Sequence, residues 1–222
     1  MKKTGAPGRC LPPLWLAALA AGLFALMAVQ ILVWGGSPID GPVYGAVSHF
    51  AGPGLTKVVT AITHLGGPAV LVVLCAAATL LFWKKWGWQP AAVNAGTLVA
   101  VALCNKIIKH LVERPRPALE WLVEESGFSF PSGHSSGAVA FYGLLILFVL
   151  NRMEGKKRFW ISGLLGLLIL CIGLSRVYVG VHYASDVLAG WCEGVVWLSV
   201  ISRIPWVGSA ICGPDLPPKK EG

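Results

Sequence analysis

Six long apolar stretches constrain this 222-residue chain more than any other feature of its sequence. A helix needs about 20 apolar residues to cross the hydrocarbon core of a bilayer, where backbone polar groups have to be satisfied within the protein. The stretches cover residues 14–34, 68–83, 90–108, 133–150, 159–174 and 185–204. Because 55% of the residues are apolar and only 13% are charged, the sequence predicts an all-α integral membrane protein with six transmembrane helices in a bundle.

The polar segments between these stretches are too short to form a second domain. We therefore expect one transmembrane domain over residues 14–204, flanked by tails at 1–13 and 205–222. The segment 43–62 is only mildly apolar and is interrupted by Gly and Pro, which favours short helical pieces or an interfacial segment. The first apolar stretch is too long for a secretory signal and no small-residue cleavage site follows it, so an uncleaved helix is expected.

Basic residues gather before the first apolar stretch and after the second, fourth and sixth. They are Lys2, Lys3, Arg9, Lys84, Lys85, Arg152, Lys156, Lys157, Arg158, Arg203, Lys219 and Lys220. Lys and Arg accumulate in cytoplasmic connections, so the pattern predicts a multi-pass protein of the inner (plasma) membrane with both termini in the cytoplasm. The net charge of +8 then reflects topology, and we expect no nucleic-acid partner and no obligatory protein partner.

The cysteines give no sign of a metal site or of a disulfide framework. All six stand singly in or beside apolar stretches, and no Cys-x-x-Cys pair occurs. No cluster of carboxylates suits a metal ion either. The sequence therefore predicts neither a metal nor a cofactor.

Three polar segments stand at helix ends on the predicted extracytoplasmic side, and the first carries two cations. Lys109 ends the third apolar stretch, and Arg116 follows on a Pro-rich turn. An ammonium group and a bidentate guanidinium there would bind one phosphate group. The alternative is that both side chains extend to lipid headgroups. By chemistry alone, Lys106 and Arg114 are equally suitable cations.

The second segment, Pro131-Ser132-Gly133-His134, opens the fourth apolar stretch. Ser132 suits the N-cap, Gly133 permits close approach, and the first backbone N–H groups with the helix dipole favour an anion. His134 in the first turn would give a proton to a leaving oxygen. The alternative is an interfacial histidine on a capped helix.

The third segment combines Arg176, His182 and Asp186 between the fifth and sixth stretches. His182 and Asp186 are four residues apart and share one face if the turn between them is helical. A carboxylate on one imidazole nitrogen fixes the tautomer and leaves the other nitrogen as a nucleophile. The alternative is a pair that only caps a helix, and the nearby Arg176 favours catalysis.

In this order and at these spacings, the three segments resemble the signature of the type-2 phosphatidic acid phosphatase superfamily, which includes membrane lipid phosphatases and soluble vanadium haloperoxidases. The spacing to Arg116 selects Lys109 over Lys106. The resemblance implies a metal-independent enzyme in which His182 forms a phosphohistidine, His134 protonates the leaving oxygen and then activates water, and Asp186 orients His182. The residues it implies for binding the phosphoryl oxygens are Lys109, Arg116, Ser132, Gly133 and Arg176.

A six-helix body with an outward site favours a lipid phosphate or diphosphate that arrives from the bilayer. Undecaprenyl diphosphate and phosphatidylglycerophosphate are the leading expectations, and phosphatidic acid and lipid A phosphate are alternatives. A vanadate-dependent oxidase is disfavoured because the haloperoxidases are soluble. A non-catalytic lipid-phosphate binder or transporter would not need His134, His182 and Asp186, all of which are present.

Overall fold

The computed structural model describes residues 11–213, and its regular structure over that range is helical. The predicted tails fall partly outside it, because residues 1–10 and 214–222 lie beyond the described residues. The elements are α1 (Leu14–Trp34), α2 (Asp40–Ser48), α3 (Pro53–Leu65), α4 (Pro68–Trp86), α5 (Trp88–Val112), α6 (Gly133–Ala138), the π-helical turn η1 (Val139–Gly143), α7 (Leu144–Arg152), α8 (Lys157–Tyr178), α9 (Ala184–Ile201) and α10 (Pro205–Cys212).

Six helices within the described range are long and apolar enough to cross a membrane. They are α1, α4, α5, α8, α9 and the continuous helix Gly133–Arg152, which α6, η1 and α7 form together. Each begins and ends within about one turn of the stretch predicted from the sequence. The prediction of an all-α membrane protein with six spanning helices in a bundle is therefore confirmed.

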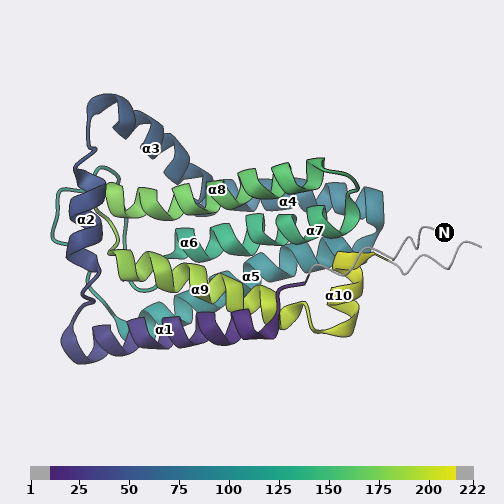
Figure 1. Ribbon diagram of the computed structural model, residues 1–222, viewed down its shortest axis with the longest axis horizontal. Helices are drawn as coiled ribbons and strands as arrows, with labels where there is room; N and C mark the ends of the chain where they lie inside the picture. The colour runs from purple at the N-terminus through teal and green to yellow at the C-terminus, as the bar shows by residue number, and fades with distance from the viewer. Residues whose placement is uncertain (1–10, 214–222) are drawn as a thin grey trace, which may run out of the picture.

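The spanning helices lie side by side, with α1 along one edge of the bundle and packed on α9 (Figure 1). The central positions belong to Gly133–Arg152 and α9, of which 67% and 61% are buried, against 17–33% for the other spans. Gly190 and Gly194 permit this close packing. A Cβ on Gly190 would lie 2.5 Å from the Ser132 carbonyl oxygen, and one on Gly194 would lie 2.5 Å from Val139 Cβ. A Gly-x-x-x-Gly face of this kind is typical of packed membrane helices.

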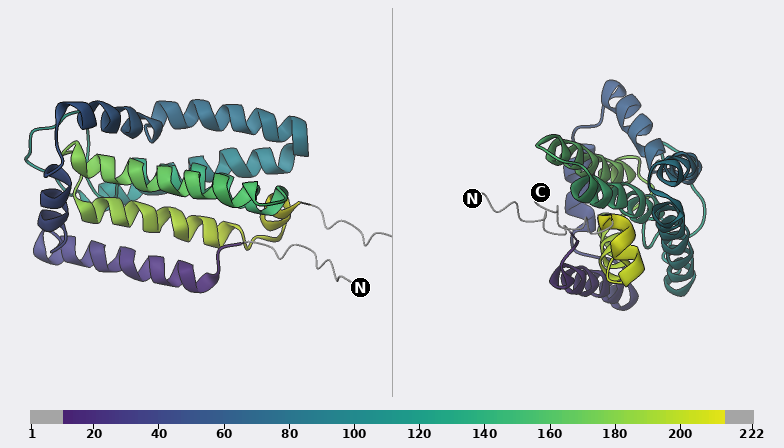
Figure 2. Two further views of the ribbon diagram at one scale, coloured as in Figure 1. Left: turned by 45° about the horizontal axis from the view of Figure 1, so that its top comes forward. Right: turned by 90° about the vertical axis from the view of Figure 1, so that its right-hand side faces the viewer.

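The two ends of the bundle differ. The α4–α5 and α7–α8 turns and α10 lie at one end, and α2 and α3 lie at the other (Figures 1 and 2). The mildly apolar segment 43–62 falls mostly in these two short helices, which agrees with the expectation of short helical pieces. Pro53 stands in the first turn of α3, where its missing N–H leaves no helical bond unmade.

Two segments differ from the sequence-based expectation. The side chains of residues 118–125 predict a short surface helix after the Pro-rich turn. The segment is instead irregular, since Leu122 N–H donates to the Val179 carbonyl and Trp121 Nε1 donates to the Pro117 carbonyl. In the predicted C-terminal tail, Pro205–Cys212 forms α10, and its Val207 and Ile211 are buried in the core. The described part of that tail is therefore packed structure.

Candidate active site

The three polar segments meet at the end of the bundle that holds α2 and α3. The end of α5, the start of α6 and the α8–α9 turn border a cavity of about 320 Å³. The predicted site residues on its wall are Lys109, Arg116, Gly133, His134 and His182. Arg176 lies on an adjoining cavity of about 250 Å³, which His134 also lines. The structure thus brings six of the eight predicted site residues to the walls of two adjoining cavities, and Asp186 and Ser132 lie behind these walls.

Arg116 reaches this position because α5 stops just before it. Glu113 adopts a left-handed conformation with φ of 49°, and Pro115 and Pro117 forbid a further helical turn. The guanidinium then donates to the Ser126, Gly127 and Val181 carbonyls at 2.8, 3.0 and 2.9 Å. It therefore ties the α5–α6 connection to the α8–α9 turn.

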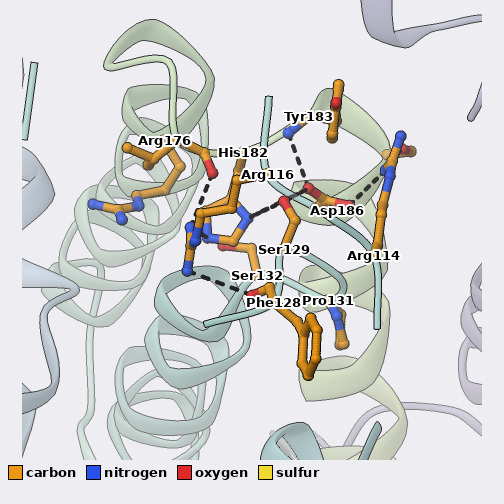
Figure 3. A network of polar contacts seen from close by, with 12 residues as sticks. Arg114, Arg116, Phe128, Ser129, Pro131, Ser132, Arg176, His182, Tyr183 and Asp186 are labelled. Atoms are coloured by element: carbon orange, nitrogen blue, oxygen red, sulfur yellow. Dashed lines mark hydrogen bonds and ion pairs between the residues drawn. The ribbon is translucent and has the colours of Figure 1, made fainter. Parts of the chain in front are cut away.

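His182 lies in the α8–α9 turn with its two ring nitrogens in different surroundings (Figure 3). Its Nδ1 lies 3.4 Å from Asp186 Oδ2 and 3.2 Å from Ser129 Oγ, whereas Nε2 lies 3.2 Å from Arg116 Nη1. An acceptor carboxylate beside Nδ1 favours the proton there and leaves the Nε2 lone pair for chemistry. Burial lowers the pKa of His182 to about 4, and the hydrogen bond to Asp186 opposes part of this shift. The imidazole is therefore neutral at pH 7, as a nucleophile has to be.

Asp186 is fully buried in the first turn of α9. Its carboxylate accepts hydrogen bonds from Ser129 Oγ at 2.5 Å, the Tyr183 backbone N–H at 2.9 Å and Arg114 Nη1 at 2.6 Å. A buried charge is stable only when it is paired and hydrogen-bonded in this way. The carboxylate is therefore held in place beside His182 from several directions.

Arg114 and Asp40 are members of the site that the set of predicted site residues does not include. Arg114 Nη2 lies 2.7 Å from Asp40 Oδ2, and Asp40 Oδ1 accepts the Ser185 N–H at 2.9 Å. Arg114 also lies 3.8 Å from the centre of the Tyr183 ring. By chemistry alone, Arg114 is an alternative to Arg116 as the phosphate-binding cation. In the structure, it pairs with the Asp186 carboxylate instead. The sequence did not indicate a role for Asp40 in the site, because α2 precedes the three polar segments by more than 60 residues of chain.

The predicted phosphate ligands Lys109 and Arg176 lie on different sides of the site. Lys109 Nζ donates to the Phe128 carbonyl at 2.6 Å and also faces the larger cavity. Arg176 Nη1 donates to Thr63 Oγ1 at 3.0 Å, and Nη2 forms an ion pair with Glu125. Figure 3 shows Arg176 apart from the bonds that surround Asp186.

Ser132 is turned away from the cavity. Its hydroxyl oxygen caps α6 by accepting from the Ser135 backbone N–H at 3.4 Å, and its own N–H donates to the Asp186 carbonyl oxygen at 3.0 Å. The side chain is fully buried. Its N-cap role is present, whereas its role as a phosphate ligand stays a prediction.

Within residues 11–213, no group of three or more His, Cys, Asp or Glu side chains is arranged to hold a metal ion. Apart from the Asp186 and Glu125 carboxylates, the charged groups around His182 are the cations Lys109 and Arg116, which suit an anion. Independence from metals and cofactors stays a prediction for experiment.

Comparison with known families bears on this arrangement. The family model described as the PAP2 superfamily matches residues 90–208, which include all three polar segments and more than half of the chain. The chain belongs to this superfamily. The resemblance inferred from the three segments is thereby confirmed.

Known proteins resemble this chain in sequence and, in one case, in structure. The phosphatidylglycerophosphatase B of Bacillus subtilis (strain 168) is 36% identical over 149 residues, which cover 65% of this chain and 72% of that protein. The undecaprenyl-diphosphatase of Sulfolobus acidocaldarius is 30% identical over 135 residues, which cover 56% of this chain and 59% of that protein. The crystal structure of a transmembrane PAP2-type phosphatidylglycerolphosphate phosphatase from Bacillus subtilis superposes with a TM-score of 0.76 at 30% identity, covering 85% of this chain and 94% of that one. The prediction of a multi-span membrane enzyme of the phosphatase class is confirmed.

Proposed function

We propose that this enzyme removes phosphate from a lipid phosphate or diphosphate through a phosphohistidine on His182. One observation carries the lipid class. The cavity that His134 and His182 line continues between α4 and α5, where its wall consists of apolar side chains. They are Pro68, Leu71, Val72, Leu98 and Ala102. Val72 is 62% exposed on the outer face of a spanning helix, where lipid would contact it. A lipid tail would therefore lie against α4 and α5 while its phosphate reaches the histidines.

The chemistry follows from the positions of the polar groups. His182 Nε2 attacks phosphorus in line, an N–P bond forms, and the P–O bond to the leaving group breaks. His134 protonates the departing oxygen and then takes a proton from the water that hydrolyses the phosphohistidine. Phosphoryl transfer needs mainly positioning and compensation of charge on the phosphoryl oxygens. Lys109, Arg116 and Arg176 supply that charge, and the N–H of Gly133 at the start of α6 adds a hydrogen-bond donor.

The residues behind His182 orient it. Asp186 keeps the proton on Nδ1, and it also stabilises positive charge on the ring when Nε2 is phosphorylated. Arg114 and Ser129 hold the carboxylate in turn. A binder or transporter would need no such support for one imidazole, which is why catalysis is preferred over binding alone.

Two relatives support the choice of substrate. Their names assign phosphatidylglycerophosphate to one and undecaprenyl diphosphate to the other, and both compounds are lipids with an exposed terminal phosphate. We therefore propose these two compounds as the leading substrates, with phosphatidic acid and lipid A phosphate as alternatives. The protein itself acts on substrate drawn from the membrane, without nucleic acid and without an obligatory protein partner.

Phosphate release from a panel of these four lipids, in detergent and with excess EDTA, tests both the activity and its independence from metals. We expect turnover to be unchanged by EDTA, because Lys109, Arg116 and Arg176 supply the charge that Mg²⁺ supplies elsewhere. Loss of turnover with EDTA and its recovery with Mg²⁺ would contradict the proposed role of these cations. Turnover of none of the four lipids would contradict the proposed substrate class.

The orientation in an inner membrane is proposed from the position of the basic residues. Lys84, Lys85, Arg152 and the run 156–158 all lie at the turns opposite the candidate site (Figure 1). The positive-inside tendency then puts this end in the cytoplasm and the site outside.

Single cysteines introduced into a cysteine-free background test this orientation. A membrane-impermeant thiol reagent applied to intact cells is expected to label Glu124→Cys and to leave Lys156→Cys unlabelled until the cells are broken. Both positions are exposed in the structure, so access differs only by side of the membrane. The reverse pattern would overturn the proposed orientation.

A further inference from the structure

Glu125 carries a carboxylate that none of the proposed catalytic steps uses. It lies in the connection between α5 and α6. Its Oε2 forms an ion pair with Arg176 Nη2 and lies 3.9 Å from His134 Nδ1, while its Oε1 lies 3.8 Å from Arg116 Nη2. One carboxylate therefore approaches three of the groups proposed to bind or protonate the phosphoryl oxygens.

Its place in the cavities agrees with these contacts. Glu125 lines the larger cavity together with Lys109 and His182, and it also lines the adjoining cavity together with Arg176. Its side chain is 23% exposed, whereas those of Arg116 and Arg176 are 6% and 2% exposed. The carboxylate thus covers two nearly buried guanidinium groups on the side that faces the cavities.

We propose that Glu125 is an internal competitor for the phosphate seat and thereby sets which anions bind there. A guanidinium presents the same fork of donors to a carboxylate and to a phosphate. A phosphoryl group that binds Arg116 and Arg176 has to displace the Glu125 carboxylate, because two anions at one site repel each other. This inference rests on the proposed function and deepens it by naming a residue that determines specificity.

The consequence is discrimination by charge. A phosphomonoester or a terminal diphosphate carries up to two negative charges on its end group, whereas the phosphodiester of an ordinary membrane phospholipid carries one. The more highly charged group competes better with a carboxylate for two guanidinium groups. Glu125 therefore keeps the abundant phosphodiester headgroups out of the site and admits the rarer monoesters and diphosphates.

Calorimetric titration of the purified full-length protein with inorganic phosphate tests this without turnover. If the Glu125–Arg176 ion pair is formed in roughly nine molecules of ten, it lowers the apparent affinity for phosphate about tenfold. We therefore expect Glu125→Gln and Glu125→Ala to bind phosphate about tenfold more tightly than the wild type. We also expect phosphatidylglycerol, a phosphodiester, to become a stronger inhibitor of lipid phosphate hydrolysis in both variants.

Glu120→Gln is the matched control, because it removes the same charge from the same connection between α5 and α6. Glu120 is exposed, lines neither of the two cavities, and within the described residues forms no ion pair with Arg116 or Arg176. Its phosphate affinity is expected to equal that of the wild type. Unchanged or weaker binding in both folded Glu125 variants, or an equal gain in Glu120→Gln, would overturn the proposal. A wild type that binds phosphate but hydrolyses no lipid phosphate would contradict the proposed function alone.

Discussion

His182→Ala is expected to lower kcat by roughly 10⁴–10⁶-fold, the range found when an enzyme loses a member of its nucleophilic unit. The substitution removes the atom that bonds to phosphorus. Among the described residues that line the cavity, no other imidazole has an orienting carboxylate at hydrogen-bonding distance. Substrate binding should persist, because Lys109 and Arg176 remain. Steady-state release of phosphate from the best lipid of the panel measures the effect.

His49→Ala serves as the control for the loss of a histidine. His49 follows α2, is exposed, and does not line either of the two cavities. We expect its turnover to match that of the wild type. Turnover in His182→Ala within tenfold of the wild type would contradict the assignment of His182 as the nucleophile.

His134→Ala is expected to lower kcat by about 10²–10⁴-fold, the usual contribution of general acid catalysis. The loss should depend on the leaving group. A lipid alkoxide is strongly basic and needs the proton, whereas a lipid monophosphate leaving from a diphosphate needs it far less. The ratio of wild-type to variant kcat should therefore be larger for phosphatidylglycerophosphate than for undecaprenyl diphosphate.

The comparison of the two substrates separates proton donation from damage to the site. Disruption of the cavity wall, which His134 shares with Gly66, would lower both rates alike. An equal loss on the two lipids, or a larger loss on the diphosphate, would contradict the role of His134 as the acid. Burst kinetics of phosphohistidine formation would show which step the substitution slows.

Much of the fold could be predicted from the chain because it depends on local properties. The six apolar stretches fix the spanning helices, and Gly190 with Gly194 marks where two of them approach closely. The end of α5 was likewise predictable, since Pro115 and Pro117 cannot continue a helix. The irregular course of residues 118–125 was not, because it depends on a hydrogen bond to Val179 in the distant α8–α9 turn.

The site was predictable where short spacings bring residues together and unpredictable where the fold does so. His182 and Asp186 lie four positions apart, so one helical turn aligns them. Arg114 reaches Asp186 across 72 positions, and Asp40 reaches Ser185 across 145. No short sequence pattern predicts contacts between residues so far apart in the chain. Glu125 was passed over for the same reason, because only the folded α5–α6 connection brings it to Arg176.

Rapid-quench trapping of the covalent intermediate in alkaline detergent, in which the P–N bond of phosphohistidine is stable, tests the central proposal most directly. The enzyme is mixed with a ³²P-labelled lipid phosphate, quenched within milliseconds, and digested under conditions that preserve phosphohistidine. In the wild type, we predict that the label is found on the peptide that contains His182. In His134→Ala, the label should accumulate if hydrolysis of the phosphohistidine is slowed more than phosphoryl transfer to His182. In His182→Ala, the label should be absent. Label at position 134, or label that persists in His182→Ala, would contradict the proposed mechanism.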